Sequence, residues 1–172
     1  MPSEDFHEMS DEDVSALVAY LQSLPPSAND PGPLEVRPLG RVLWLFGKFP
    51  LLPAEHIDHA PRARTAPAPA ATAEYGKYLA QGCVGCHGAS FSGQHVPGTP
   101  PDFPDSQNLT PAAIGSWKEA DFFRAIRTGK RPDGSDIKTF MPWQTYAKMS
   151  DVELSALWAY LRTLPPVESK KK

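Results

Sequence analysis

The stretch that decides the fold reads "YGKYLAQGCVGCHG" and runs from residue 75 to residue 88. It holds the only two cysteines of the 172-residue chain, Cys83 and Cys86, in the pattern Cys-x-x-Cys, with His87 directly after them. Two thiols at this spacing can each add across one vinyl group of a haem, and the adjoining histidine is then held under the iron as its proximal ligand. The stretch therefore predicts one covalently attached c-type haem, anchored by Cys83 and Cys86 and ligated by His87.

Two other interpretations of the cysteine pair stay open. A thioredoxin-like redox pair belongs beside a βαβ unit, whereas no convincing strand pattern occurs in the sequence. A structural zinc ion normally takes four Cys or His ligands, so a zinc site would need His95 in addition to the three residues of the motif. The complete Cys-x-x-Cys-His pattern favours haem over both.

A first helix is predicted over residues 72 to 82, directly before the motif, with Gly82 as its end. Gly76 and Ala80 lie four residues apart in this segment and therefore share one face of the helix. Because both residues are small, we expect a second helix to approach this face closely.

A second helix is predicted over residues 115 to 129, "GSWKEADFFRAIRTG". Ser116 followed by Glu119 has the spacing of a capping box, and Gly129 has the position of a helix terminator. The phenylalanines and the isoleucine between them form an apolar stripe at helical spacing.

A third helix is predicted over residues 150 to 164, with Ser150 and Glu153 as its capping box and two prolines as its stop. The domain is therefore expected to be all-α, with three main helices joined by long loops. Long loops in a compact domain are either functional or disordered. A large apolar cofactor would supply the core that three helices alone do not.

The sixth iron ligand is expected from a methionine, because a thioether opposite histidine raises the reduction potential of an electron carrier. Met141 lies in the extended stretch "TFMPW", where the next proline restrains the backbone and Trp143 could pack on the haem. Met149 has a local explanation instead, since it precedes a helix cap and can pack on Leu154 as a hydrophobic staple. We therefore expect Met141 to be the distal ligand, with His95 as a further alternative.

The composition limits the size of the packed core. The chain has 20 prolines, a net charge of −3 and a pI near 5.9. The prolines gather in connecting stretches, and the charge balance does not favour nucleic acid as a partner. The lysines that end the chain are expected to be a solvated tail over residues 167 to 172.

The chain also contains an internal repeat. Residues 1 to 26 align without a gap on residues 141 to 166, and about half of the positions are identical. Both copies begin with Met-Pro, contain Met-Ser-Asp and end with Leu-Pro-Pro. A match of this length indicates duplicated units.

One strongly apolar stretch, "VLWLFGKFPLLP" over residues 42 to 53, stands apart from the predicted domain. It is too short to span a bilayer and is interrupted by one lysine and two prolines. It is expected to be a short helix or an extended segment packed against a domain, with a membrane-surface or partner-docking patch as the alternative. Residues 1 to 13 are polar and acidic and do not resemble a secretory signal.

Taken together, residues 72 to 166 resemble a class I c-type cytochrome domain. The stretches that carry the resemblance are "YGKYLAQGCVGCHG", "NLTP", "IGSWKEADFFRAIRTG", "DG", "FMPW" and "MSDVELSALWAYLRTLPP". The ensemble is similar to the haem domains of multi-haem cytochrome subunits of bacterial membrane-associated dehydrogenases. The resemblance implies an electron carrier with one haem c, crossed first and last helices, and Met141 as a second iron ligand beside His87.

Two contacts are carried over from that family. Gly76 would face Trp158 or Tyr160 where the helices cross. A proline carbonyl after the motif would orient His87 and tune the iron. The candidates for that carbonyl are Pro97, Pro100 and Pro101.

The resemblance also offers an explanation of the repeat. Residues 1 to 26 are similar to the end of a preceding cytochrome domain, with residues 27 to 71 as a Pro-rich connector. Because that domain would lack its Cys-x-x-Cys-His motif here, the sequence is expected to be a fragment of a longer multi-haem protein. The implied location is the periplasm or the outer face of the cytoplasmic membrane, where haem of this type is attached.

The expected function is transfer of single electrons to and from redox partner proteins in a respiratory chain, and not catalysis. The alternatives are a haem enzyme or gas-binding protein with an open sixth position, and a thiol-redox module without haem. A group of cations before Met141 is expected to be a solvated face, with docking of an acidic redox partner as the alternative. These cations are Lys118, Arg124, Arg127, Lys130, Arg131 and Lys138.

Overall fold

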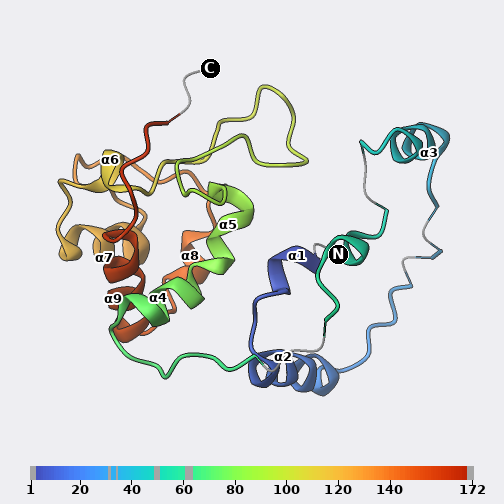
Figure 1. The fold of residues 1–172 in the computed structure, drawn as a ribbon, viewed down its shortest axis with the longest axis horizontal. Helices are drawn as coiled ribbons and strands as arrows, with labels where there is room; N and C mark the ends of the chain where they lie inside the picture. Colours follow the sequence, from blue (N-terminus) through green and yellow to red (C-terminus); the bar gives the residue numbers. More distant parts are fainter. Residues whose placement is uncertain (1–2, 31, 34, 49–50, 61–63, 170–172) are drawn as a thin grey trace. The chain divides into compact units, whose positions relative to one another are not determined.

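The computed structural model describes residues 3–30, 32–33, 35–48, 51–60 and 64–169. The chain divides into two compact units, Met1–Ala66 and Pro67–Lys172 (Figure 1). Both units are helical, and the described residues contain no β-strand beyond one isolated bridge between Lys130 and Asp136. The predicted all-α class is confirmed.

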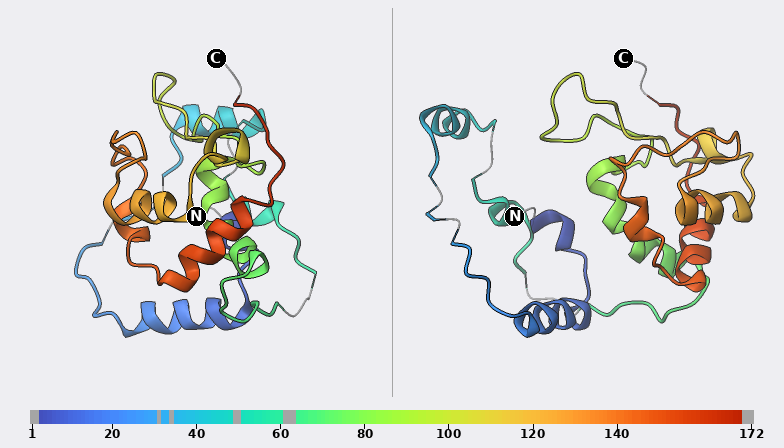
Figure 2. Two further views of the ribbon diagram at one scale, coloured as in Figure 1. Left: turned by 90° about the vertical axis from the view of Figure 1, so that its left-hand side faces the viewer. Right: turned by 180° about the vertical axis from the view of Figure 1, so that it is seen from behind.

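The second unit is organised by the crossing of its first and last helices, α4 (Ala73–Leu79) and α9 (Asp151–Leu161), which pack side by side (Figures 1 and 2). Gly76 faces Ala156 and Tyr160 at this crossing. The expected contact with Tyr160 is confirmed, and the second neighbour is Ala156 in place of Trp158. The absence of a side chain on Gly76 brings the two backbones together.

The helix before the motif was predicted to end at Gly82, and this prediction is wrong. It breaks at Ala80, and a second helix, α5 (Gln81–His87), then carries the Cys-x-x-Cys-His motif. Gly88 ends α5 with a φ of 79°, a conformation that glycine adopts without steric cost. The motif therefore lies inside a helix, whose last residue is His87.

The helix predicted over residues 115 to 129 is shorter at its start, since α7 covers Glu119–Thr128. The predicted capping box, Ser116 with Glu119, is wrong, and the N-cap lies two residues later. The side chain of Asp121 accepts a hydrogen bond of 3.0 Å from the backbone N–H of Lys118, which makes Lys118 the N-cap. Residues 115 to 117 instead close the turn that follows α6 (Pro111–Ile114).

Two predicted helix ends are confirmed, at Gly129 and at Ser150, whereas α9 ends at Leu161, before the predicted end at residue 164. Gly129 terminates α7 in the left-handed conformation, with a φ of 70°. Ser150 caps α9, and Glu153 completes its capping box with a 2.6 Å hydrogen bond from the backbone N–H of Ser150. A short helix, α8 (Trp143–Tyr146), lies between α7 and α9 in the sequence and packs against α7.

A single apolar cluster forms the core of the second unit. It combines α4, α7 and α9 with the loop after α5 and with α6, so the loops contribute to the core as well as the helices. Its buried members are Ala80, Phe91, Ile114, Phe122, Ile126, Leu154, Leu157 and Leu161.

The first unit consists of α1 (Ser3–Phe6), α2 (Asp11–Ser23), α3 (Pro38–Leu45) and a 3₁₀ turn, η1 (Pro53–His56). The side chain of Ser10 caps α2 by accepting a hydrogen bond from the backbone N–H of Asp13. Like α9 in the C-terminal copy, α2 ends before a pair of prolines. Neither α2 nor α3 contains a buried residue. Among the described residues, no helix is long and apolar enough to cross a membrane.

Candidate haem site

A cavity of about 480 Å³ lies in the second unit. Its walls come from α5, α7 and α9 and from two loops, residues 104–109 and 137–142. All four predicted site residues line this cavity: Cys83, Cys86, His87 and Met141. The fold therefore brings together residues that lie more than fifty positions apart in the sequence.

The chemistry of the walls fits a haem. Most lining side chains are apolar, which is typical of a pocket for a large planar cofactor, and the volume is in the range of cofactor pockets. The lining also supplies two thiols, a buried imidazole and a thioether sulfur, which are the groups that attach and ligate a c-type haem.

The zinc alternative finds no support in the structure. In the described part of the chain, no group of three or more His, Cys, Asp or Glu side chains is placed to hold a metal ion. His95, which would be the fourth ligand, contacts Asp105 and Thr99 instead, at 3.3 Å and 3.1 Å.

The two cysteines differ in their surroundings. Cys86 is exposed, while Cys83 is partly buried beside the core. Burial raises the pKa of the Cys83 thiol to about 11, and the nearby Cys86 adds to the rise. Cys83 is therefore a protonated thiol at neutral pH.

His87 is buried, and its orientation is fixed by one hydrogen bond. The Nδ1–H of His87 donates to the backbone carbonyl of Gln107 over 2.7 Å, so Nε2 keeps its lone pair. Burial lowers the pKa of His87, although the bond to Gln107 acts in the opposite direction. The imidazole is thus held neutral, in the tautomer and orientation that a metal ligand needs.

The expectation that a proline carbonyl orients His87 is wrong. Pro97, Pro100 and Pro101 are all exposed, in the outer part of the loop between α5 and α6. That loop turns back toward the helix, and its returning end passes the imidazole at Gln107. A backbone carbonyl has no residue-specific pattern, so the sequence contained no signal for this contact.

The returning end of the loop is tied to α5 and to the core. The Ser106 hydroxyl donates to the carbonyl of Cys86 over 2.7 Å, and the Leu109 N–H donates to the carbonyl of Phe91 over 2.8 Å. Phe91 is buried and has a φ of 56°, an unusual value for a residue with a side chain. These bonds hold Gln107 in position beside His87.

A second tie comes from the segment after the last helix. Asn108 donates from its side-chain amide to the carbonyl of Val167 over 2.7 Å, and the Thr110 hydroxyl donates to the same carbonyl over 3.1 Å. Both side chains are buried. The chain beyond α9 therefore fastens the loop within a few residues of the carbonyl that orients His87.

Both methionines considered for the sixth iron position reach the cavity. Met141 and Met149 are partly buried, and each lines the wall. Met149 directly precedes the capped start of α9, which is the place where a hydrophobic staple forms. Met141 lies in the loop between α7 and α8, outside any helix.

The aromatic residue at the cavity wall is not the one predicted. Trp143 packs against Gly129 at the end of α7, where its indole nitrogen is buried without a hydrogen-bond partner. The aromatic residues that line the cavity are Trp117, Phe122, Phe140 and Tyr146. Burial raises the pKa of Tyr146, with smaller contributions from the two cysteines, so its hydroxyl stays protonated.

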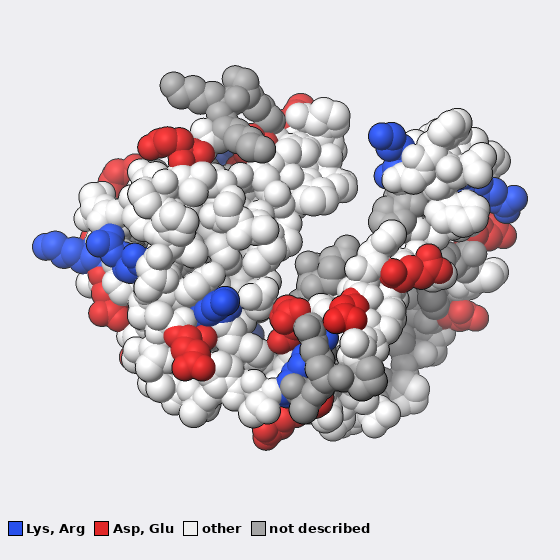
Figure 3. All heavy atoms as spheres, in the orientation of Figure 1, with Lys and Arg blue, Asp and Glu red and all other residues white. Residues whose placement is uncertain are grey.

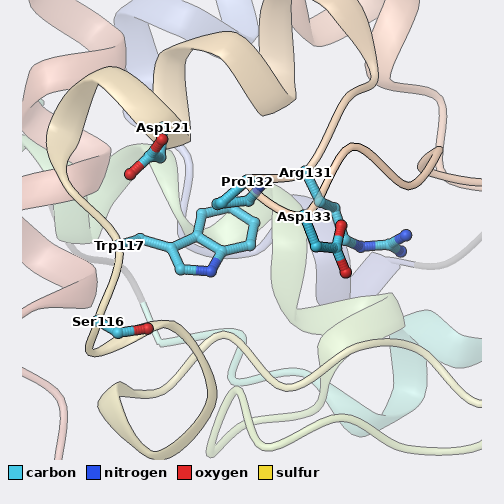
Figure 4. A pocket seen from close by; sticks show the side chains of 6 residues that line it. All are labelled: Ser116, Trp117, Asp121, Arg131, Pro132 and Asp133. Atoms are coloured by element: carbon cyan, nitrogen blue, oxygen red, sulfur yellow. The ribbon is translucent and has the colours of Figure 1, made fainter.

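An open pocket of about 280 Å³ adjoins the cavity and shares three lining residues with it, namely Trp117, Arg131 and Asp133. The Trp117 indole lies between Ser116 and the loop that carries Arg131 and Asp133 (Figure 4). The Arg131 guanidinium donates to the carbonyl of Asp136 over 2.6 Å, which closes this loop on itself. The shared residues mark an outer edge of the cavity.

Comparison with known proteins assigns the class that the fold and the site define. Residues 73–165 match the family described as cytochrome c. The chain belongs to this family. Membership of the cytochrome c family implies a covalently bound haem c and electron transfer, and the predicted fold class is confirmed.

Several relatives are cytochrome subunits of dehydrogenases. The gluconate 2-dehydrogenase cytochrome c subunit of Pantoea cypripedii is 36% identical over 107 residues, covering 56% of this chain and 24% of the relative. The alcohol dehydrogenase (quinone) cytochrome c subunit of Gluconacetobacter polyoxogenes is 33% identical over 120 residues, covering 64% and 26%. The fructose dehydrogenase cytochrome subunit of Gluconobacter japonicus is 32% identical over 105 residues, covering 55% and 22%. The chain spans about a quarter of the length of these relatives.

Proposed function

We propose that the chain carries one haem c, bound through Cys83 and Cys86 and ligated by His87 and Met141, and that it transfers single electrons. When bound, the haem supplies the reversible one-electron change, and the protein sets its potential and exposure. The observation that carries the proposal is the convergence of the oriented imidazole of His87 and the sulfur-bearing Met141 on one apolar cavity.

The residues of this chain would divide the work as follows. The two thiols would fix the cofactor in the cavity, and the bond from His87 to Gln107 would hold the imidazole in one orientation through repeated electron transfers. Apolar walls would limit the access of water, which favours a stable potential. Met141 would close the sixth position.

An open sixth position, as in a peroxidase or a gas-binding protein, is the competing proposal. Two methionines at the wall of the cavity argue against it, since either could occupy the iron. A closed iron with ligands on both faces suits electron transfer, because it reacts with neither peroxide nor gases.

We propose a dehydrogenase subunit as the electron donor, because the relatives named above are cytochrome subunits of gluconate, alcohol and fructose dehydrogenases. The location would be the periplasm or the outer face of the cytoplasmic membrane, where haem of this type is attached. An acidic docking partner is not favoured. Of the six cations considered for docking, three are in ion pairs: Arg124 with Asp121, Arg127 with Asp151 and Lys130 with Asp136.

On the face of the second unit that Figure 3 shows, Lys and Arg side chains likewise lie near Asp and Glu side chains, in small groups of mixed charge. Such a surface produces little net field for steering a charged partner. Contact with the donor would then depend on shape and apolar surface around the cavity edge.

We further propose that residues 1–26 are the closing segment of another cytochrome domain, joined to this one by residues 27–71. In α9, the repeat positions Leu154, Ala156 and Leu157 are almost fully buried against the rest of the second unit. The equivalent positions in α2 are exposed, with Val14 at 38% and Leu17 at 37%. A helix like α4 would cover them.

The function is tested on protein from a host that exports it and attaches haem. We expect one haem per chain by pyridine haemochrome assay, a red band that survives denaturing electrophoresis, and a low-spin spectrum that does not react with peroxide or carbon monoxide. The variant Cys83→Ser with Cys86→Ser should lose the band. Retention of the pigment by this variant would refute the attachment, and rapid binding of carbon monoxide by the parent protein would favour the open-position alternative.

A further inference from the structure

Two loops of the second unit bound the haem cavity, and each carries a group that the proposed iron ligation needs. Residues 104–109 include Gln107, whose carbonyl accepts the hydrogen bond of His87. Residues 137–142 include Met141. The placement of one loop relative to the other therefore decides whether an imidazole and a thioether can reach the same iron.

A pair of rings, the aromatic clasp, joins these two parts of the chain. The rings of Phe103 and Phe140 have centroids 4.2 Å apart and planes at 70°, which is an edge-to-face contact at the short end of the range for such pairs. Phe140 lines the cavity, and so does Pro104, the residue after Phe103. The contact therefore lies at the rim of the cavity.

The aromatic clasp lies outside the hydrophobic core. Among the described residues, the core cluster and the partly buried side chains packed against it include neither ring. Phe140 is 42% exposed, and Phe103 is half-buried. Side chains that stay this accessible contribute less to folding than buried ones, so core packing does not explain why the two rings meet.

Each ring is close in sequence to a group that the site depends on. The N–H of Met141 donates to the carbonyl of Lys138 over 3.0 Å, which forms a turn that contains Phe140, the residue before Met141. Phe103 precedes Gln107 by four residues. A shift of either ring would therefore move the backbone that carries the adjacent group.

The segment that carries Met141 has little regular structure of its own. Between α7 and α8, residues 130–142 form turns and one isolated bridge, between Lys130 and Asp136. That bridge lies five residues before Met141. Loops with few backbone hydrogen bonds open at a low cost in free energy. A further contact near Met141 is therefore needed to hold its sulfur at the cavity.

We propose that Phe103 and Phe140 are positioning residues, which hold Met141 at the cavity by joining its loop to the loop that orients His87. The aromatic clasp would lower the rate at which the thioether leaves the iron. The inference rests on the proposed function, because it takes His87 and Met141 as the iron ligands. It goes further by assigning the persistence of that ligation to two residues that are not ligands.

Docking of a partner protein is the competing explanation for rings at a rim. Rings that serve a partner would be free to contact it, whereas these two already contact each other edge to face. The two explanations also differ in what they predict for the isolated protein. A docking pair would leave the sixth ligand unaffected, whereas the clasp would control how often that ligand leaves.

The test measures how fast imidazole replaces the sixth ligand in the oxidised, haem-loaded full chain. At saturating imidazole, this rate equals the rate at which Met141 leaves the iron. Phe103→Ala and Phe140→Ala should each raise it between about twofold and about tenfold, the range to which the strength of one aromatic pair converts. The double variant should be no faster than the faster single variant, because the loss of either ring opens the clasp.

Three controls separate the clasp from a general loss of stability. Phe140→Tyr keeps an aromatic ring and should retain the parent rate. Phe6→Ala removes a phenylalanine of nearly equal exposure, 41%, from the first unit and should change nothing. In a Met141→Ala background, removal of either ring should no longer alter the rate of imidazole binding, because no thioether is left to hold.

Hydrogen exchange of the reduced protein tests the contact between the loops without reference to the iron ligand. Phe103→Ala should speed the exchange of backbone amides in residues 137–142, and Phe140→Ala that of residues 104–109, by a similar factor. The sulfur-to-iron band of the parent is recorded in the same samples. Its absence would refute the Met141 ligation of the proposed function, while faster exchange across the cavity would still support the tie between the loops.

Three results would overturn the proposal. Imidazole rates that stay at the parent value in both single variants would favour the docking explanation. Single-variant effects that multiply in the double variant would mean that the rings act independently of each other. Faster imidazole binding with unchanged exchange in the opposite loop would mean that each ring acts only on its own loop.

Discussion

Gly76 of α4 and Ala156 of α9 are so close that no side chain fits between them. A Cβ atom on Gly76 would overlap the carbonyl group of Ala156 and lie 2.8 Å from Cβ of Tyr160. Because α5, with the two cysteines and His87, continues directly from α4, this contact also sets the position of one wall of the haem cavity.

Replacing Gly76 with alanine is therefore expected to push the two helices apart. We expect the free energy of unfolding to fall by at least about 2 kcal/mol, as for overpacked cores in general. Guanidinium unfolding followed by haem absorbance measures the change. Lys77→Ala is the matched control, since Lys77 is the next residue of α4 and is exposed. Equal stability of the two variants would show that the helices do not meet at Gly76.

Met141 is expected to be the distal ligand. Met141→Ala should remove the thioether from the iron, lower the reduction potential and let water or added imidazole bind. The weak sulfur-to-iron band at the red end of the oxidised spectrum should disappear.

Met149→Ala is the matched control for that experiment, because Met149 lines the same cavity. It should keep the band and lose about 1 kcal/mol of stability, as for other devices at helix ends. If the band survived in Met141→Ala and vanished in Met149→Ala, the two assignments would have to be exchanged.

Asp133, at the outer edge of the cavity, gives a prediction on pH. Its carboxylate accepts hydrogen bonds from the hydroxyl and the backbone N–H of Ser135, at 2.7 Å and 2.9 Å. These bonds hold the pKa of Asp133 below its ordinary value of 3.8. The carboxylate form therefore favours the folded loop above pH 3.8, and this contribution is lost as the pH falls through the lower pKa of the folded state.

The variant Ser135→Ala should raise the pKa of Asp133 toward the ordinary value, because the hydroxyl bond is the largest cause of the shift. Carboxyl chemical shifts of the reduced, diamagnetic protein measure it. Ser116→Ala alters another residue of the same pocket and should leave the titration unchanged. Identical titrations in the two variants would contradict the role of Ser135.

Removal of residues 1–26 should leave the haem domain intact. The described residues of α2 are all exposed or half-exposed, and the second unit has its own core. The shortened chain should show the spectrum, the potential and the unfolding midpoint of the second unit in the parent protein. Loss of haem binding or of the folded state would instead make this segment an integral part of the domain.

Local signals in the sequence were sufficient for several parts of the structure. The capping box at Ser150 and the terminator Gly129 each depend on residues a few positions apart, and each lies where it was predicted. Gly76 was identified from its spacing to Ala80, since two small residues on one face of a helix allow another helix to approach closely.

Other local signals were ambiguous. The predicted pair, Ser116 with Glu119, overlaps a second pair of the same spacing, Lys118 with Asp121, although lysine is not a preferred N-cap residue. The second pair forms the cap because the preceding turn after α6 already uses residues 115 to 117. Local pattern alone could not decide between two overlapping frames.

The contacts that position the haem ligand depend on chain segments far apart. Gln107 follows His87 by 20 residues and contributes only its carbonyl, which every residue type possesses. Trp117 lines the cavity where Trp143 was expected for a similar reason, since which indole reaches the cavity depends on how the loops return to the helices.

The tie between Asn108 and Val167 changes where the domain should be said to end. The match to the cytochrome c family stops at residue 165, after the last helix, whereas the carbonyl that fastens the ligand-orienting loop belongs to residue 167. A chain cut after Pro166 would keep every helix of the second unit, yet Asn108 and Thr110 would lose their shared acceptor. The functional border of this domain is therefore set by one hydrogen-bonded carbonyl in an unstructured-looking tail, and a boundary drawn from helices alone would leave it out.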